Sequence, residues 1–450
     1  MKFIIVFSFS LLFLVTFISC DANEPLPQGA VGLTLEDVSC TEAWMTLTAG
    51  NLSNTAYIRV TGNGKLLETL DVNSVKTTLY FDTLQPNTTY EFQAFSSQRG
   101  EEIVGNKLQF TTLDTTSHNF TWQTIEFGEI INQSHLFDVA IINENNIWAV
   151  GEIYMNDSLG QSIRYNAVHW DGSDWELKRI YYYGTCSAVT YPPLTAICTF
   201  DENNIVVTNG GSIGWFNGTT INLDCRVSPL LTGSINKMWG SSSNDLYAVG
   251  SNGNIAHYQN GSWAKIESGT DLVLSDITVN NLGEIFICGG NPSLGTGTIL
   301  KSSNGNNFST FVEGANIPES QLFNPKLYGS FSSIWVDQNN TLYSGGNILF
   351  QNKFGKWSYV KSLPENFIGG NPGVYYRGYI TKVRGNVSND MWIIGDRNTV
   401  RHFNGVSWQQ IGLPYDPQSP IVWRSMSIND KAKVIVGNNS RKAIIMMIKK

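Results

Sequence analysis

Asn146-Ile-Trp-Ala-Val-Gly151 is the stretch that decides the fold, because the chain repeats it. A polar turn residue is followed by a short apolar run that closes on glycine. Close copies are Asp245-Leu-Tyr-Ala-Val-Gly250 and Asp390-Met-Trp-Ile-Ile-Gly395. Further copies begin at Asn204, Glu284, Thr341 and Lys433, which makes seven in all. Short strands that recur in this way predict a ring of β-sheets.

A second phrase, a tight turn followed by tryptophan, alternates with the first. The clear copies are Asp171-Gly-Ser-Asp-Trp175, Asn260-Gly-Ser-Trp263, Phe354-Gly-Lys-Trp357 and Asn404-Gly-Val-Ser-Trp408, and weaker ones begin at Asn217 and Asn304. Asn-Gly and Asp-Gly favour hairpin turns because both residues tolerate positive φ. The seventh copy lies upstream, around Trp122, whereas the chain ends without one. We therefore expect residues 118–450 to form a seven-bladed β-propeller whose last blade is completed by the strand around Trp122.

Three of the five histidines occupy one place in this repeat, directly before an aromatic residue and the turn. They are His169, His257 and His402. A position that recurs from blade to blade is typical of a structural role. We expect each imidazole to make the same local hydrogen bond, and we assign none of them to catalysis or metal binding.

Residues 27–114 show a different pattern, with period-2 alternation of apolar and polar residues in short runs. This alternation predicts a small β-sandwich. Leu84-Gln-Pro-Asn-Thr-Thr-Tyr90 resembles the corner of fibronectin type III domains, in which the tyrosine hydroxyl ties the strand end to the preceding loop. The resemblance implies a fibronectin type III domain over 27–114, with Trp44 as its core tryptophan.

The first nineteen residues have the layout of an export signal. Lys2 precedes an apolar run from Phe3 to Ile18, which is shorter than the roughly twenty residues of a membrane span. Ser19-Cys20 resembles the lipobox of bacterial lipoproteins, although Phe17 stands where that motif usually has Leu or Val. The resemblance implies lipid attachment at Cys20, with residues 20–26 as a tether. An ordinary secretory signal is the alternative.

Composition narrows the possible functions. The chain has 29 Lys and Arg against 37 Asp and Glu, a net charge of −8, which excludes a basic nucleic-acid surface. We find no zinc-ligand spacing, phosphate loop or nucleophile elbow, and expect neither a metal nor a cofactor. Five widely spaced cysteines follow Cys20. Cys186 and Cys225 lie in consecutive blade-to-blade loops and are our first choice for a disulfide.

The candidate binding residues are those that break the repeat. The longest segments are blade-to-blade loops and one middle hairpin, and in a propeller both emerge on one face, which we call the variable face. Irregular loops on a regular scaffold favour a functional surface. The candidates are Tyr181, Tyr182, Tyr183, Tyr191, Phe323, Tyr328, Phe367, Tyr375, Tyr376, Arg377, Tyr379, Tyr415 and Trp423. Packing of these aromatic side chains onto the rim is the alternative for each of them.

Two functions remain. The first is a binding module that presents the variable face to a glycan or a protein. The second is a propeller glycoside hydrolase or lyase, which needs two carboxylates about 5–10 Å apart. Its candidates are Glu152, Asp157, Glu313, Glu319, Glu365 and Asp416, and no motif singles out a pair. The layout resembles lipoproteins of Bacteroidetes, which implies attachment to the outer membrane on a side that stays open, and no oligomeric state is predicted.

Overall fold

The structure, a computed structural model, describes most of the chain after Ala30. The described residues are 30–50, 57–71, 76–98, 101–129, 133–182, 189–318, 321, 323–360, 379–414, 416 and 418–449. They divide into two compact units, one ending at Thr112 and one beginning at Leu113, with residues 39–41 assigned to the second. The described residues contain no α-helix, only the 3-10 turns η1 (Ser228–Leu230) and η2 (Ser251–Gly253). The fold is therefore all-β.

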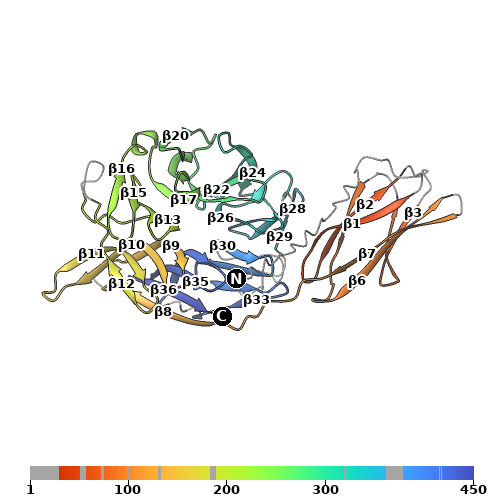
Figure 1. Cartoon of the computed structure of the whole chain (residues 1–450), viewed down its shortest axis with the longest axis horizontal. Helices are drawn as coiled ribbons and strands as arrows, with labels where there is room; N and C mark the ends of the chain where they lie inside the picture. The colour runs from red at the N-terminus through yellow and green to blue at the C-terminus, as the bar shows by residue number, and fades with distance from the viewer. Residues whose placement is uncertain are drawn as a thin grey trace, which may run out of the picture. The chain divides into compact units, whose positions relative to one another are not determined.

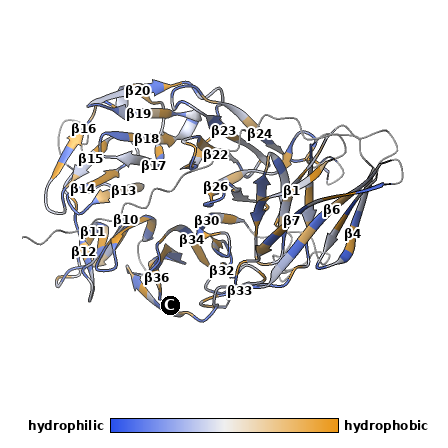
Figure 2. Ribbon diagram, turned by 45° about the vertical axis from the view of Figure 1, so that its right-hand side comes forward, coloured by the Kyte–Doolittle hydropathy of each residue, from blue (hydrophilic) through white to orange (hydrophobic). Residues whose placement is uncertain are grey.

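The first unit is built from two sheets. Its strands are β1 (Val31–Val38), β2 (Ala43–Ala49), β3 (Tyr57–Gly62), β4 (Lys65–Asp71), β5 (Lys76–Phe81), β6 (Thr89–Gln98) and β7 (Glu101–Thr111). The sheet orders are β1-β2-β5 and β4-β3-β6-β7. Apolar side chains from both sheets, including Met45, Val60 and Phe92, form one core. The period-2 alternation thus predicts the buried side of each strand, and Figure 2 shows apolar and polar stretches along these strands.

Two details of this unit bear on the sequence prediction. The Tyr90 hydroxyl accepts a hydrogen bond from the backbone N–H of Gln85 at 2.9 Å, so it ties the strand back to the preceding loop as expected. The expectation that Trp44 lies in the core is wrong. Its neighbours Ala43 and Met45 face the core, while Trp44 is half-buried and packs against Tyr80 with ring centroids 5.4 Å apart.

The second unit contains seven sheets within the described residues. The first contains β9 (His135–Asn143), β10 (Asn146–Asn156), β11 (Ser162–Trp170) and β12 (Trp175–Lys178). The second contains β13 (Ala196–Asp201), β14 (Asn204–Thr208), β15 (Ile213–Phe216) and β16 (Ile221–Asp224). The third contains β17 (Ile235–Ser242), β18 (Asp245–Gly250), β19 (Ile255–Gln259) and β20 (Ser262–Ile266). The fourth contains β21 (Leu274–Val279), β22 (Ile285–Asn291), β23 (Thr296–Ser302), β24 (Ser309–Ala315) and the short β25 (Leu327–Tyr328).

The remaining sheets continue the series. The fifth contains β26 (Phe331–Val336), β27 (Leu342–Gly346), β28 (Phe350–Lys353) and β29 (Lys356–Tyr359). The sixth contains β30 (Ile380–Val387), β31 (Asp390–Gly395), β32 (Val400–Phe403) and β33 (Trp408–Gln410). The seventh contains β34 (Ile421–Ile428), β35 (Lys433–Asn439), β36 (Lys442–Lys449) and, from upstream, β8 (Thr121–Phe127).

The first strands of these sheets surround a common centre. Each first strand contacts the first strand of the next sheet, in the order β9, β13, β17, β21, β26, β30 and β34, and β34 contacts β9 again. Figure 1 shows β9, β13, β17, β26 and β30 towards the centre, with β12, β16, β20 and β33 at the periphery. The sheets therefore close into a ring, the arrangement of a β-propeller.

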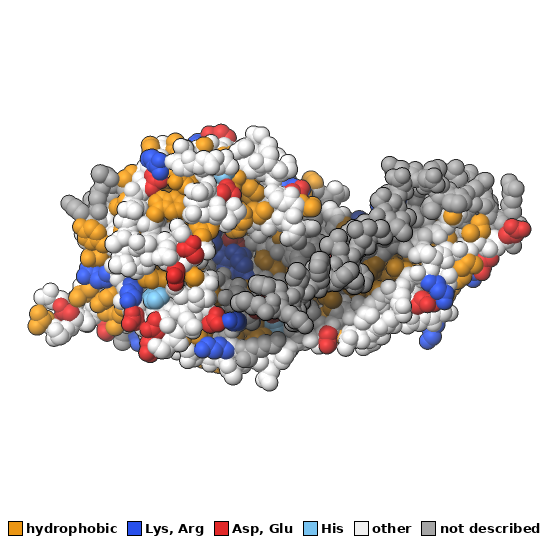
Figure 3. Space-filling model, in the orientation of Figure 1, with side chains coloured by type: hydrophobic (Ala, Val, Ile, Leu, Met, Phe, Trp, Pro, Cys, Tyr) orange, Lys and Arg blue, Asp and Glu red, His pale blue; other side chains and the backbone are white. Residues whose placement is uncertain are grey.

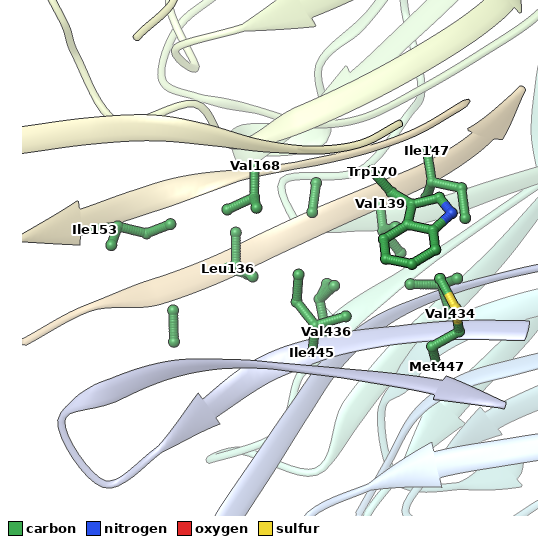
Figure 4. Close-up of a cluster of buried hydrophobic side chains, with 12 residues drawn as sticks. Leu136, Val139, Ile147, Ile153, Val168, Trp170, Val434, Val436, Ile445 and Met447 are labelled. Carbon is green, nitrogen blue, oxygen red and sulfur yellow. The ribbon is translucent and has the colours of Figure 1, made fainter. Parts of the chain in front are cut away.

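The ring is closed by the strand that the sequence predicts for this role. β8 pairs antiparallel with β36, and Trp122 lies opposite Ile448. Side chains of the first and last sheets then pack together, and Figure 4 shows Val168 and Trp170 beside Val436 and Met447. Pairing of β8 covers the edge of β36, which would otherwise expose a row of unpaired backbone groups.

The glycine that closes the repeated phrase has a steric cause. A Cβ on Gly250 would lie 1.8 Å from the carbonyl oxygen of Ser234, and one on Gly151 would lie 2.1 Å from that of His135. In both sheets the pairing of the first and second strands shifts register at this point, which brings the carbonyl close. The same clash occurs at Gly289, Gly346, Gly395 and Gly437. Close backbone approach thus explains the glycine in the motif.

The repeat histidines also have one structural role. Nε2 of His169, His257 and His402 lies 3.0, 2.6 and 3.0 Å from an oxygen of the residue that starts the second strand of the sheet. Those residues are Asn146, Asp245 and Asp390. The prediction of a shared local hydrogen bond is confirmed.

No helix of the described residues is long and apolar enough to cross a membrane.

Candidate functional site

A cavity of about 370 Å³ lies at the centre of the ring. Asp138, Lys237, Lys382 and Ser425 line it, together with one residue at or near the start of each of the seven first strands. We call these seven residues the lining ring. They are Phe137, Thr195, Asn236, Ser275, Ser332, Thr381 and Arg424. The connections from sheet to sheet arrive at these strand starts, so the cavity lies at the variable face. Figure 3 shows Lys and Arg side chains gathered in a hollow among the propeller sheets.

The lining ring also joins neighbouring sheets. Thr195 Oγ1 donates to the carbonyl of Ile235 at 3.2 Å, and Thr381 Oγ1 donates to that of Trp423 at 2.6 Å. Asn236 Nδ2 donates to the carbonyl of Leu274 at 3.2 Å, and Ser332 Oγ donates to that of Ile380. Each bond runs from one first strand to the next. Because the hydroxyl protons of Thr195, Ser332 and Thr381 are used in these bonds, their oxygens remain as acceptors, whereas the Asn236 amide keeps a second N–H.

A charged layer lies directly beneath the lining ring, and it consists of Asp138, Lys237, Asp276, Lys382 and Arg384. Lys237 Nζ lies 2.7 Å from both carboxylate oxygens of Asp138. Asp138 also accepts from Ser425 Oγ at 2.6 Å and from the backbone N–H of Ile197 at 3.1 Å. The side chains involved come from the first, third and seventh sheets, and the backbone N–H comes from the second. The layer therefore fixes the inner strands relative to one another.

Asp276 is the most enclosed member of the charged layer. Its side chain is fully buried and accepts two hydrogen bonds from Arg384, at 2.9 and 3.0 Å, and one from Ser333 Oγ at 2.8 Å. Lys382 Nζ lies 3.3 Å away. Burial alone would raise the pKa of Asp276, but Arg384 and Lys382 hold it well below its ordinary range. Asp276 is thus a structural anion and no general acid.

The sequence-predicted aromatic residues that the structure describes lie on several different connections and strands. Tyr181 is 51% exposed and packs against Tyr191 in the connection between β12 and β13, with the ring centroids 5.9 Å apart. Phe323 is 36% exposed and packs against Tyr359 on the outer strand β29, with the ring centroids 5.1 Å apart. Tyr328 is half-buried in β25. Tyr379 directly precedes β30, with its hydroxyl 3.3 Å from Ser330 Oγ. Tyr183, Phe367, Tyr375, Tyr376, Arg377 and Tyr415 lie outside the described residues, as does Cys20.

Two of the predicted binding residues are core residues. Tyr182 is fully buried, and its hydroxyl donates to the carbonyl of Ser212 at 2.9 Å. Trp423 is 1% exposed and packs between the sixth and seventh sheets. Their side chains fill space between sheets, so neither contributes to an exposed surface.

The structure describes four of the cysteines, including one of the two expected to form a disulfide. Cys225 is disulfide-bonded, whereas Cys40, Cys198 and Cys288 are free. Cys186, the proposed partner of Cys225, lies outside the described residues. Burial raises the pKa of the Cys288 thiol well above its ordinary value. Among the described residues, no group of three or more His, Cys, Asp or Glu side chains could hold a metal ion.

The four described carboxylates among those considered for hydrolysis do not line the cavity. Glu152 pairs with Arg164 at 3.2 Å, and Glu313 pairs with Lys326 at 2.7 Å. Asp157 and Asp416 accept backbone hydrogen bonds within their own turns. Glu319 and Glu365 lie outside the described residues. None of the four described carboxylates lines the cavity.

Sequence reasoning missed the lining ring and the charged layer. A signal for them exists, because four of the seven first strands, β17, β21, β26 and β30, start with two polar residues between apolar neighbours. Examples are Ile235-Asn-Lys-Met238 and Ile380-Thr-Lys-Val383. Polar residues at one fixed place in otherwise apolar strands would have marked the centre of the ring.

The chain matches no protein-family model and no curated protein. Among solved structures, YCF48 bound to a D1 peptide is similar over 75% of this chain and 97% of that chain, with 12% identity and a TM-score of 0.52. YCF48 from Cyanidioschyzon merolae matches over 73% of this chain and 98% of that chain, with 14% identity and a TM-score of 0.48. PorZ, a surface component of the type-IX secretion system of Porphyromonas gingivalis, matches over 93% of this chain and 68% of that chain, with 10% identity and a TM-score of 0.33. We draw no conclusion from the latter two. The first likeness shows a shared fold alone, and with the closed ring of sheets it shows that the chain contains a β-propeller.

Proposed function

We propose that this chain is an exported lipoprotein that acts as a binding module. Cys20 carries the lipid, residues 20–26 form the tether, and residues 27–114 form a fibronectin type III domain. Each sheet of the second unit is then one blade of a seven-bladed propeller over residues 118–450. The variable face of this propeller binds a glycan or a protein.

The observation that carries the proposal is the central cavity. It opens among the strand starts of all seven sheets and is lined mainly by hydroxyl, amide and cationic groups. Such a concave site with convergent polar groups on a rigid scaffold is typical of ligand binding. Its two nearest carboxylates, Asp138 and Asp276, are held in ion pairs with lysine and arginine. This arrangement supports binding over acid–base hydrolysis.

The binding of D1 peptide by YCF48 adds a precedent for ligand binding on this fold. At 12% identity that precedent says nothing about the ligand of this chain. Both glycan and protein therefore belong in the first test.

Filling the cavity is the sharpest test of its role. Ser275 lines the cavity, is half-buried and makes no side-chain hydrogen bond within the described residues, so Ser275→Phe adds a ring without removing a bond. Ser309 is exposed on the outer strand β24, and Ser309→Phe is the matched control. The full chain, purified in detergent, is applied to a glycan array and to a protein pull-down.

We expect ligands that Ser309→Phe retains and Ser275→Phe loses. Ligand binding that survives Ser275→Phe in a folded protein would contradict the site. Turnover of a bound polysaccharide would contradict the binding-module assignment and favour the hydrolase or lyase.

A further inference from the structure

Two neighbouring residues break the pattern of the lining ring. Five of its seven positions hold Ser, Thr or Asn, and four of these donate to the next strand. The other two positions hold Phe137 and Arg424, on β9 and β34. These strands are adjacent where the ring closes, and the Arg424 guanidinium lies over the Phe137 ring at 5.5 Å from its centroid. The two residues that differ from the rest of the lining ring are therefore in contact with each other.

Arg424 has no counter-ion within the described part of the chain. Its Nε donates to Asn438 Oδ1 at 3.0 Å, which leaves the terminal nitrogens of the guanidinium without a described acceptor. Burial lowers the pKa of Arg424, because no nearby carboxylate offsets the loss of water. Lys237, Lys382 and Arg384, by contrast, each have an aspartate within 4 Å. A half-buried, unpaired cation is costly unless a ligand supplies the opposite charge.

The local charge balance points the same way. Among the described residues around the cavity, Lys237, Lys382, Arg384 and Arg424 face Asp138 and Asp276, so positive charges there exceed negative ones by two. The whole chain has a net charge of −8. A positive site within an acidic protein favours anionic ligands.

The hydrogen-bonding groups left to a ligand define its chemistry further. The protons of Thr195, Ser332 and Thr381 are used between strands, so these hydroxyls offer oxygen acceptors. The donors left to a ligand are the Ser275 hydroxyl, the second N–H of the Asn236 amide and the cationic groups, and a guanidinium can bind a carboxylate or sulfate through two parallel bonds. Phe137 is the one large apolar side chain of the lining. This set suits a ligand with many hydroxyl groups and one oxyanion better than an apolar peptide side chain.

We propose that the cavity binds an acidic sugar residue of a polysaccharide, with its carboxylate or sulfate on Arg424. This inference rests on the proposed binding function and names its ligand class. Phe137 holds the guanidinium in place, and the hydroxyl oxygens of the lining ring accept bonds from the sugar hydroxyls.

The test measures binding of oligosaccharides to the full chain by titration calorimetry. The probes are oligogalacturonate for the carboxylate, oligosaccharides of chondroitin sulfate for the sulfate, methyl-esterified oligogalacturonate as the uncharged match, and a peptide with a free carboxyl terminus. Arg424→Gln removes the cation. Arg397→Gln is the control, because Arg397 is exposed in the hairpin between β31 and β32 and lies outside the cavity.

We expect at least one acidic probe to bind, roughly tenfold or more weaker binding in Arg424→Gln, and no change in Arg397→Gln. The methyl-esterified probe should bind the unaltered chain as weakly as the acidic probe binds Arg424→Gln. This comparison tests the role of the ligand's charge even if Arg424→Gln fails to fold. Unchanged affinity in folded Arg424→Gln, equal binding of the esterified probe, or binding of the peptide alone would overturn the inference and leave the proposed binding function intact. Absence of binding by any glycan or protein would overturn both.

Discussion

Replacing Asp276 by asparagine tests the energetic role of the charged layer. The aspartate side chain is fully buried, and its partners Lys382 and Arg384 are 8% and 19% exposed. Asparagine keeps the shape but removes the charge, which leaves two enclosed cations without their counter-ion. Breaking a buried pair from one side costs about 3–5 kcal/mol. We expect Asp276→Asn to lower the free energy of unfolding of the propeller by that amount.

The assay is urea unfolding followed by tryptophan fluorescence, because every tryptophan except Trp44 lies in the second unit. Asp430→Asn is the matched control, since Asp430 is exposed and makes no described ion pair. Adding Arg384→Gln to Asp276→Asn should restore part of the loss, because one unpaired cation is then removed. Equal unfolding free energies for Asp276→Asn and Asp430→Asn would refute the reasoning.

The pH dependence of the same variant has a defined sign. The pKa of Asp276 is depressed in the folded protein, so its contribution is complete above the unfolded value of about 3.9. This contribution is lost as the pH falls below that value towards the folded pKa. The stability of the unaltered chain should therefore fall more steeply than that of Asp276→Asn below about pH 4. Parallel acid-unfolding curves for the two proteins would contradict the coupling.

Three further predictions concern packing, closure and the disulfide. Tyr182→Phe should lower the free energy of unfolding by about 1 kcal/mol and leave ligand affinity unchanged, because it removes the bond to Ser212 inside the core; loss of affinity in calorimetry would contradict the core assignment. Deleting residues 118–127 removes β8 and should cause self-association through the uncovered edge of β36, visible by light scattering; a stable monomer would argue against closure by β8. Peptide mapping without reduction should show Cys186 linked to Cys225, and any other partner for Cys225 would overturn that pairing.

The architecture could be predicted because local rules and repetition agree. The terminal glycines mark the point where first and second strands approach closely, as at Gly151 and Gly250. The displaced copy around Trp122 predicts its pairing with the last strand, because a ring leaves no other sheet for it to complete. Strand alternation also predicts core residues of the first unit such as Met45 and Phe92, but it does not predict that Trp44 is half-buried or that Tyr80 is 45% exposed.

The site could not be predicted in the same way, because its residues come together only in three dimensions. Lys237 and Asp138 are 99 positions apart, and Arg384 and Asp276 are 108 apart. No local motif joins them, because each pair is formed by residues of two different strands. For two aromatic residues the error was the opposite, because the sequence pattern assigned buried side chains to the binding surface. Tyr182 and Trp423 look like surface residues in sequence, yet both fill space between sheets.

Hydrogen–deuterium exchange of the full chain, with and without a bound ligand from the array, tests the central claim most directly. If the propeller binds at its centre, slower exchange should appear at the starts of the first strands, in residues 135–139, 380–384 and 421–426, and in the connections that lead into them. Protection confined to the first unit, or to the opposite turns at 143–146, 242–245 and 387–390, would contradict it.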